Sequence, residues 1–241
     1  RLSPAYYGRV SPRGDGAPVV VVPGFLASDL HLVELHLWLR RVGYEPVLSD
    51  IGRNADCPDV LFERLIETVE DTNQRTGRRV RLIGHSFGGV LARAAAARMP
   101  GQVSQVITLA APFRSLRANR LVLKAARTFA RLLPSPSEQP RPHRDHTHAN
   151  ECACEFLRAG LSAWPSAVHR AAVYTKTDGV VDWHACVEDD PETNFEVHGS
   201  HTGLVFNPEV YALLARILSA REDGDRPAHA PVVAPTRRRT R

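Results

Sequence analysis

The chain has 241 residues, a formal net charge of +5 at pH 7 and four cysteines. This length suits one α/β domain with a well-buried core and excludes two typical domains joined by a linker. The longest apolar run, from Val19 to Ala27, is far too short to cross a bilayer, so no integral membrane segment is expected. No signal peptide is visible and the chain begins at Arg1 without a methionine, so its location stays open, with the cytoplasm favoured.

Much of the positive charge lies near the carboxyl terminus. Residues 221–241 hold six arginines against three acids, which places +3 of the net charge in a segment rich in proline and alanine. A composition of this kind, without apolar periodicity, predicts a disordered and solvated tail after a folded domain at 1–220. Because the remaining charge is small, we expect no nucleic-acid partner.

The cysteines are Cys57, Cys152, Cys154 and Cys186. Four cysteines in a chain of this length do not make a disulfide framework, and Cys-Ala-Cys lacks the Cys-x-x-Cys spacing of redox and zinc motifs. Buried thiols are therefore expected, with a bridge from Cys152 or Cys154 to Cys186 as the alternative.

Strand and helix patterns alternate along most of the chain. A β-branched run at 19–22 ends at Pro23-Gly24, and helical apolar spacing then extends from Leu30 to a stop at Gly43. A helix that Asp59 caps is expected to end near Gly77. Further strands are expected at 45–48, 80–83, 103–109, 171–175 and 195–197, with helices at 90–99 and, after an Asn207 cap, from Pro208 to Leu218. This alternation predicts a doubly wound, mostly parallel sheet of six strands.

Residues 112–168 interrupt the alternation and predict a helical insertion. Basic residues recur every three or four positions over 114–133, with apolar residues between them. Such a helix either lies on an anionic lipid surface or is a lid helix whose charged side faces water. The loop that follows holds His143, Asp145, His146 and His148, but their spacing matches no standard zinc site, so a solvated loop and no metal are expected.

Gly84-His85-Ser86-Phe87-Gly88 stands between an apolar strand pattern and an alanine-rich helix pattern. Gly-x-Ser-x-Gly at a strand-to-helix junction is typical of a nucleophile elbow, in which glycines permit a sharp turn that exposes the serine. Ser86 is thus the candidate nucleophile rather than only a helix cap. Its hydroxyl oxygen is expected near the positive end of the following helix, and the backbone N–H of Phe87, the next residue, is a candidate oxyanion donor.

An activated serine needs a base, and the base needs an orienting acid. Asp178 lies just past the carboxyl end of the strand expected at 171–175, where catalytic groups collect in such sheets, and it is preferred to Asp182. His201 lies in a glycine-bearing loop before the last helix and is preferred to His198, which directly follows a strand. The chain order serine, acid, histidine is that of elbow proteins.

The motifs VVVVPGFLASD, VRLIGHSFGG, VITLAAPF, TDGVV and GSHTGLVFNPEVY resemble those of small bacterial α/β-hydrolases of the lipase and esterase type. The resemblance covers about residues 18–219 outside the insertion, and it implies an α/β-hydrolase fold whose lid lies in the insertion. It also implies that the N–H of Phe25 is the second oxyanion donor, although Pro23 stands where this family commonly has histidine.

Together these residues predict a serine hydrolase that cleaves a carboxylic ester without a cofactor. Phe25 and Leu26 are the candidate substrate contacts, and with the apolar face of the insertion they favour an apolar acyl chain, in a small-molecule or lipid ester. The same triad serves acyltransferases and thioesterases, and a non-catalytic binding protein on this scaffold is the alternative of a different class. The oligomeric state is left open.

Overall fold

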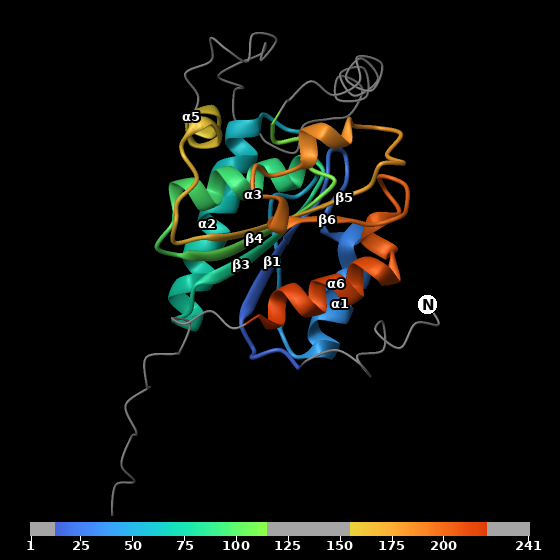
Figure 1. Cartoon of the computed structure of the whole chain (residues 1–241). Helices are drawn as coiled ribbons and strands as arrows, with labels where there is room; N and C mark the ends of the chain where they lie inside the picture. Colours follow the sequence, from blue (N-terminus) through green and yellow to red (C-terminus); the bar gives the residue numbers. More distant parts are fainter. Residues whose placement is uncertain (1–12, 115–154, 221–241) are drawn as a thin grey trace, which may run out of the picture.

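An entirely parallel, six-stranded sheet forms the centre of the computed structural model, which describes residues 13–114 and 155–220 (Figure 1). The strand order is β2-β1-β3-β4-β5-β6. Every residue of β1, β3 and β4 is buried, which explains their runs of valine, leucine and isoleucine. The strands are β1 (Pro18–Val22), β2 (Glu45–Leu48), β3 (Val80–His85), β4 (Val103–Leu109), β5 (His169–Tyr174) and β6 (Asn194–Glu196).

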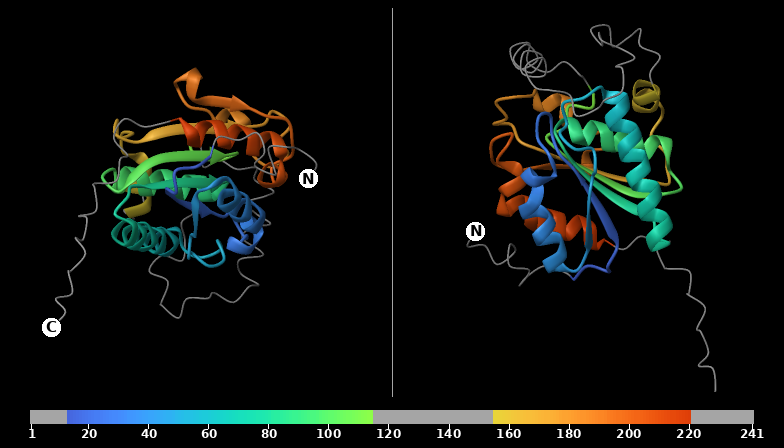
Figure 2. Two further views of the ribbon diagram at one scale, coloured as in Figure 1. Left: turned by 90° about the horizontal axis from the view of Figure 1, so that it is seen from below. Right: turned by 180° about the vertical axis from the view of Figure 1, so that it is seen from behind.

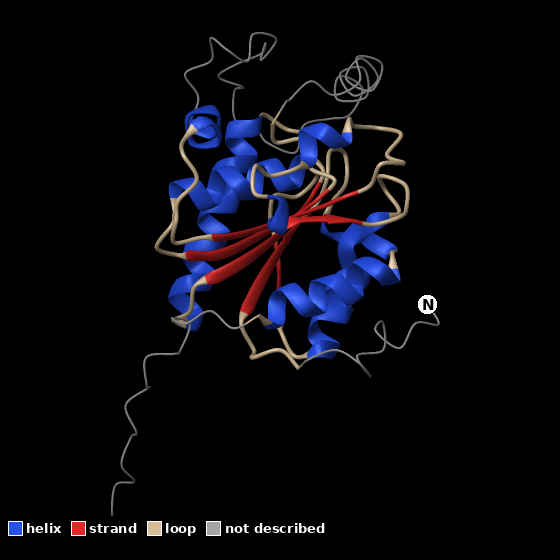
Figure 3. Ribbon diagram, viewed as in Figure 1, coloured by secondary structure: helices blue, strands red, loops and turns tan. Residues whose placement is uncertain are grey.

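Helices cover both faces of the sheet (Figures 2 and 3). One layer contains α1 (Val33–Val42) and α6 (Pro208–Ser219), and the other contains α2 (Pro58–Thr76), α3 (Phe87–Arg98) and α5 (Glu155–Leu161). Side chains of β1 alternate between the layers, because successive residues of a strand point to opposite faces. The loops contain the short 3-10 helices η1 (Asp29–Leu32), η2 (Trp183–Cys186), η3 (Pro191–Thr193) and η4 (Leu204–Phe206).

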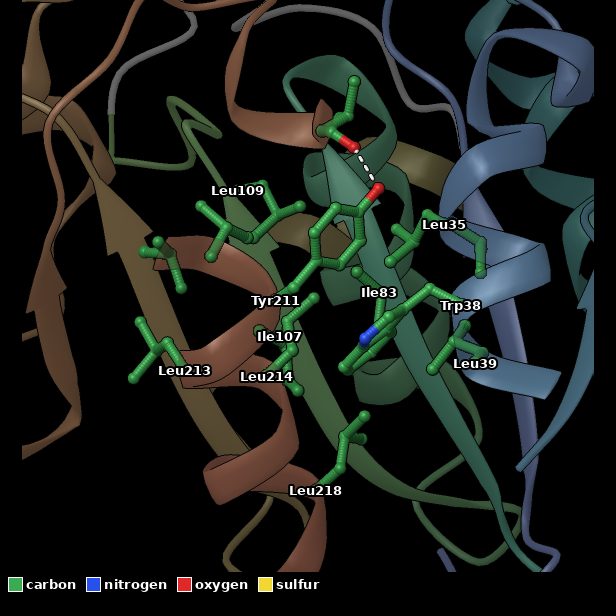
Figure 4. Close-up of a cluster of buried hydrophobic side chains, with 14 of the residues drawn as sticks. Leu35, Trp38, Leu39, Ile83, Ile107, Leu109, Tyr211, Leu213, Leu214 and Leu218 are labelled. Atoms are coloured by element: carbon green, nitrogen blue, oxygen red, sulfur yellow. Dashed lines mark hydrogen bonds between the residues drawn. The ribbon is translucent and has the colours of Figure 1, made fainter. Parts of the chain in front are cut away.

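Two aromatic residues join the α1 and α6 layer to the sheet (Figure 4). Trp38 of α1 and Tyr211 of α6 are both buried, with ring centroids 5.1 Å apart. The hydroxyl of Tyr211 donates a hydrogen bond to the carbonyl oxygen of Val205, at 2.8 Å. This bond ties α6 to η4, and η4 directly follows the loop that carries His201.

The six expected strands and the parallel arrangement are confirmed, and only the ends of elements differ. The expectation that Asp59 caps α2 is wrong, because Cys57 occupies the cap position and Pro58 begins the helix. The carboxylate of Asp59 instead accepts a hydrogen bond from the backbone N–H of Phe156, at 3.0 Å. Helix α3 begins at Phe87, earlier than the expected Val90.

Several predictions fall outside the described residues: the basic helix from residue 115 onward, the histidine-rich loop, Cys152, Cys154 and the tail at 221–241. The described end of the insertion contains α5, whose Phe156 and Ala159 are buried with α2 and α3, so this stretch belongs to the core. Cys57 and Cys186 are buried thiols. Over residues 13–114 and 155–220, no helix has the length and apolarity needed to span a membrane, and no group of three or more candidate ligand side chains forms a metal site.

The strand order places a topological switch point between β1 and β3. The chain leaves β1 for the edge strand β2 on one side and returns to β3 on the other side. In open α/β sheets, the carboxyl ends of strands on either side of such a point form the usual ligand site. The segments that begin at Pro23 and Ser86 both start there.

Candidate active site

Ser86 occupies a sharp turn between β3 and α3 with a backbone conformation that L-residues rarely adopt. Its φ is 52° and its ψ is −125°. Its N–H donates to the carbonyl oxygen of Leu109 at 2.8 Å, and its own carbonyl oxygen accepts from the N–H of Gly89 at 2.9 Å. Hydrogen bonds from strand β4 and from the first turn of α3 therefore hold Ser86 in a strained backbone conformation. Such a conformation persists only where the surrounding structure fixes it.

The glycines of the elbow are required by close backbone contacts. A Cβ atom at Gly84 would lie 2.4 Å from the Cα of Gly89. A Cβ atom at Gly88 would lie 2.4 Å from the carbonyl oxygens of Val22 and Pro23. The first turn of α3 thus packs directly on the end of β3 and on the end of β1. This leaves no room for a side chain at either glycine.

A continuous chain of hydrogen bonds joins the three residues that the sequence singles out. His201 Nε2 lies 2.9 Å from Ser86 Oγ, and His201 Nδ1 lies 2.7 Å from Asp178 Oδ2. Asp178 follows β5, and His201 lies in the loop between β6 and η4. The sheet therefore brings together residues from three segments that are far apart in sequence.

Asp178 is held as an acceptor. Its side chain is 2% exposed, and Oδ1 accepts backbone N–H bonds from Val180 at 2.8 Å and Val181 at 2.9 Å. Burial alone raises the pKa of Asp178, but the hydrogen bonds from His201, Val181 and Val180 outweigh it and hold the pKa below its usual value. An ionised carboxylate accepts the Nδ1–H of His201, which leaves the lone pair of Nε2 facing the hydroxyl of Ser86.

The alternatives Asp182 and His198 lie outside this chain of hydrogen bonds. The side chain of Asp182 is 66% exposed, and it accepts from the backbone N–H of His184 while contacting the ring of the same residue at 2.7 Å. His198 is exposed, and its carbonyl oxygen accepts from the side chain of Asn207. Asp182 thus caps η2, and the backbone of His198 contacts the start of α6.

The two expected oxyanion donors border Ser86. The backbone N–H groups of Phe25 and Phe87 have no hydrogen-bond acceptor within the described part of the chain. Phe87 is the first residue of α3, so its N–H lies at the positive end of the helix dipole. A Cβ atom at Gly24 would lie 3.2 Å from the Cβ of Ser86, which shows how closely the loop after β1 passes the serine.

His85 is a component of the site that the sequence did not single out. It is 4% exposed, and its Nε2–H donates to the carbonyl oxygen of His201 at 2.9 Å. Burial first, and the nearby His201 second, lower the pKa of His85 to about 4, so its ring is neutral at neutral pH. A neutral neighbour leaves His201 free to take up a proton without repulsion from a second cation. The available signal was a histidine directly after the apolar pair Leu82-Ile83 and Gly84.

Cys186 lies behind the acid and is not a second nucleophile. Burial first, and then the charges of Asp178 and Asp182, raise the pKa of its thiol to about 12. A neutral buried thiol is a poor nucleophile. Its Sγ lies 3.7 Å from the carbonyl oxygen of Asp182, a contact that supports the loop carrying the acid.

Aromatic and aliphatic side chains occur on the two segments that border the serine. Phe87 is half-buried and packs edge-on against Phe156 of α5, with ring centroids 5.8 Å apart. Phe25 is 39% exposed, and Leu26 beside it is half-buried. The segments that begin at Pro23 and Ser86 therefore both carry apolar side chains close to the nucleophile in sequence or in the fold.

Known proteins with a similar fold include named esterases and lipases. Residues 60–136 match the family model described as the PGAP1-like alpha/beta domain, a region that includes the elbow. A metagenomic carboxyl esterase superposes with a TM-score of 0.59 at 15% identity, over 86% of this chain and 76% of that one.

Two further solved structures give similar values. The monoacylglycerol lipase of Paleococcus ferrophilus has a TM-score of 0.55 at 15% identity, over 86% of this chain and 96% of its own. Est1E from Butyrivibrio proteoclasticus has a TM-score of 0.55 at 14% identity, over 88% and 91% of the two chains. At such low sequence identity, these superpositions are evidence for the fold alone. They confirm that the protein has the α/β-hydrolase fold.

Proposed function

We propose that the protein is a serine hydrolase that cleaves carboxylic esters. The observation that carries the proposal is the continuous hydrogen-bonded chain from Ser86 through His201 to Asp178, at 2.9 and 2.7 Å. The ester as substrate class follows from the names of the similar structures, a carboxyl esterase and a monoacylglycerol lipase among them. An intact nucleophile, base and acid argue against a purely binding role on this scaffold.

In this proposal Ser86 Oγ attacks the ester carbonyl while His201 Nε2 takes its proton. Asp178 keeps His201 in the required tautomer and stabilises the imidazolium that forms. The N–H groups of Phe25 and Phe87 donate to the oxyanion of the tetrahedral intermediate. His201 then protonates the leaving alcohol. In the second half of the reaction His201 takes a proton from water, the resulting hydroxide attacks the acyl-enzyme carbonyl, and His201 returns the proton to Ser86 Oγ as the acid leaves.

The acyl group is proposed to be apolar. Phe25, Leu26 and Phe87 lie on the two segments that border the nucleophile, and apolar side chains at such a place favour an alkyl or aryl chain over a sugar or a charged group. The same residues would serve equally well if an alcohol or an amine replaced water as the acyl acceptor, or if a thioester replaced the ester as the substrate. Product analysis with competing nucleophiles distinguishes hydrolysis from acyl transfer.

Labelling with a fluorophosphonate probe tests the proposal, together with hydrolysis of a chromogenic short-chain ester. The Ser86→Ala variant is expected to lose both, with a melting temperature close to that of the wild type, because the exchange removes only one oxygen. The matched control is Ser200→Ala, an exposed serine next to His201 that is not hydrogen-bonded to the triad. Unchanged ester turnover by Ser86→Ala rejects the assignment.

Contact of the basic segment 114–133 with lipid is a separate proposal that rests on the sequence. Binding to anionic vesicles at low salt that weakens at high salt would support it, because added salt screens charge-driven contacts.

A further inference from the structure

The loop that carries Phe25 forms a tight turn directly beside Ser86. The N–H of Ala27 donates to the carbonyl oxygen of Gly24 at 3.0 Å, and this bond closes the turn over Phe25 and Leu26. Leu26 has a φ of 63°, a conformation that usually selects glycine or asparagine. The turn therefore requires support from outside itself.

The direction of the Phe25 N–H follows from this turn. The peptide unit between Gly24 and Phe25 is trans and planar, so its carbonyl and its N–H point in opposite directions. Because the carbonyl of Gly24 is directed at Ala27, the N–H of Phe25 is directed away from the inside of the turn. Any rotation of this peptide unit would turn the proposed oxyanion donor away from its target.

Asn54 supports the turn at three points. Its carbonyl oxygen accepts from the N–H of Leu26 at 2.7 Å, and its N–H donates to the carbonyl oxygen of Ala27 at 2.8 Å. Its side-chain Nδ2 donates to the carbonyl oxygen of Pro23 at 2.7 Å. The backbone bonds hold the far half of the turn, and the side chain holds the residue at which the loop leaves β1.

The side chain of Asn54 is fully buried although one of its polar atoms has no hydrogen-bond partner in the described part of the chain, which is unusual for a residue with only a packing role. Asn54 is 0% exposed, and its Oδ1 has no hydrogen-bond partner among the residues that the structure describes. Burial of an amide with one unsatisfied oxygen costs stability. A buried polar group that breaks this rule is a common sign of a functional constraint.

We propose that Asn54 is a positioning residue for the oxyanion hole. Its Nδ2 fixes the carbonyl of Pro23, and the turn held in this way directs the N–H of Phe25 at the carbonyl oxygen of the ester. This oxygen becomes negatively charged when Ser86 attacks the carbonyl carbon. On the opposite side the loop contacts the elbow, since a Cβ atom at Gly88 would lie 2.4 Å from the same Pro23 oxygen. The inference rests on the proposed ester hydrolysis, because it assigns Asn54 to the transition state of that reaction.

The test compares ester kinetics with the binding of a transition-state analogue. An aryl trifluoromethyl ketone forms a tetrahedral adduct with the serine, so its inhibition constant reports the oxyanion hole, whereas KM mainly reports the apolar contacts. For Asn54→Ala we expect kcat to fall about 10- to 100-fold, somewhat less than the loss on removing a whole oxyanion donor. The inhibition constant is expected to rise by a similar factor, with KM changed less than about threefold.

Two further variants keep the test decisive. Asn54→Leu has nearly the same shape, lacks both the donor and the unsatisfied oxygen, and is expected to show the same kinetic loss even if Asn54→Ala fails to fold. Asn73→Ala is the matched control, because Asn73 Nδ2 also donates to a backbone carbonyl, that of Arg78 at 2.8 Å, at the end of α2. It is expected to lower the melting temperature without altering kcat or the inhibition constant.

The outcomes separate this inference from the proposed function. Folded Asn54 variants with wild-type kcat and inhibition constant would show that Asn54 has only a structural role, and the inference would be overturned. A parallel loss in both quantities, absent in Asn73→Ala, supports it. If the wild type shows neither fluorophosphonate labelling nor ester turnover, the proposed function itself is wrong, and the inference goes with it.

Discussion

Mild acid is expected to destabilise the protein through His85. This ring is 4% exposed, and its Nε2–H already donates to the carbonyl oxygen of His201. A second proton would go to Nδ1, which has no partner within the described residues and faces Gly24, where a Cβ atom would lie only 2.8 Å away. The resulting cation would be buried beside His201, with ring centroids 5.0 Å apart.

The size of the effect follows from the difference in pKa between the folded and unfolded states. Burial lowers the pKa of His85 from 6.5 in the unfolded chain to about 4 in the folded protein. Between these values the unfolded chain binds more protons, so the free energy of unfolding falls as the pH falls below about 6.5. The expected loss between pH 7.5 and pH 5.0 is about 2 kcal/mol, rising to about 3 kcal/mol once the pH is below 4.

Urea unfolding at the two pH values measures this loss. In His85→Gln, which keeps a side-chain donor but does not titrate, the decrease between pH 7.5 and 5.0 should be smaller than in the wild type by about 2 kcal/mol. Carboxylates with a lowered pKa, such as Asp178, lose their contribution only at still lower pH and do so in both proteins. His169→Gln, at an exposed position, should keep the wild-type decrease because it leaves His85 in place.

The comparison within each protein removes any constant change that the substitution itself causes. If His85→Gln loses as much stability on acidification as the wild type does, then His85 is not the group that takes up the proton. The argument from its burial would then be refuted.

Two further predictions concern the acid and the elbow. Asp178→Asn should lower kcat by about 10⁴-fold, because the neutral amide can donate its N–H to His201 Nδ1 and so favours the tautomer whose Nε2 carries the proton. Asp182→Asn, at the exposed alternative, should change kcat by less than about threefold. Equal losses in ester assays would contradict the choice of acid. Gly88→Ala should lower the free energy of unfolding by about 1–3 kcal/mol, since the new Cβ would lie 2.4 Å from backbone oxygens. Gly101→Ala, where nothing lies within 4 Å, should change it by less than about 0.5 kcal/mol, and similar urea midpoints for the two variants would show that the elbow can relax.

The centre of the sheet was predictable because β1, β3 and β4 are buried on both faces and therefore consist largely of apolar residues. Strand β4 spans Val103–Leu109, the range expected from its apolar run, and β2 spans Glu45–Leu48 as expected. The start of α3 was harder to predict, because Phe87 becomes helical only through the turn at Ser86 and the close contacts of the elbow glycines. Helix propensity alone favours the alanine-rich stretch that follows.

The residues of the triad could be selected because their chemistry resides in their side chains. Serine, aspartate and histidine in the order of the elbow proteins restrict the choice to a few positions, and the carboxyl end of β5 favours Asp178 over Asp182. The geometry that joins Asp178 to His201, at 2.7 Å, depends on two loops whose conformations no local pattern specifies.

The supporting residues leave a weaker trace for a physical reason. His85 and Asn54 act on backbone carbonyls, 116 and 31 positions away in sequence, and every residue type supplies such a carbonyl. The sequence therefore does not show which backbone carbonyl accepts each hydrogen bond, and only the side chain that donates it can be recognised. His85 is noticeable because it ends a buried strand, directly after Leu82, Ile83 and Gly84. Asn54 lies between Arg53 and Ala55 in a polar loop, where an asparagine is ordinary. Burial distinguishes His85 and Asn54 from ordinary polar residues, since both side chains are almost inaccessible to water. The burial of a polar loop residue can be recognised only in the folded chain.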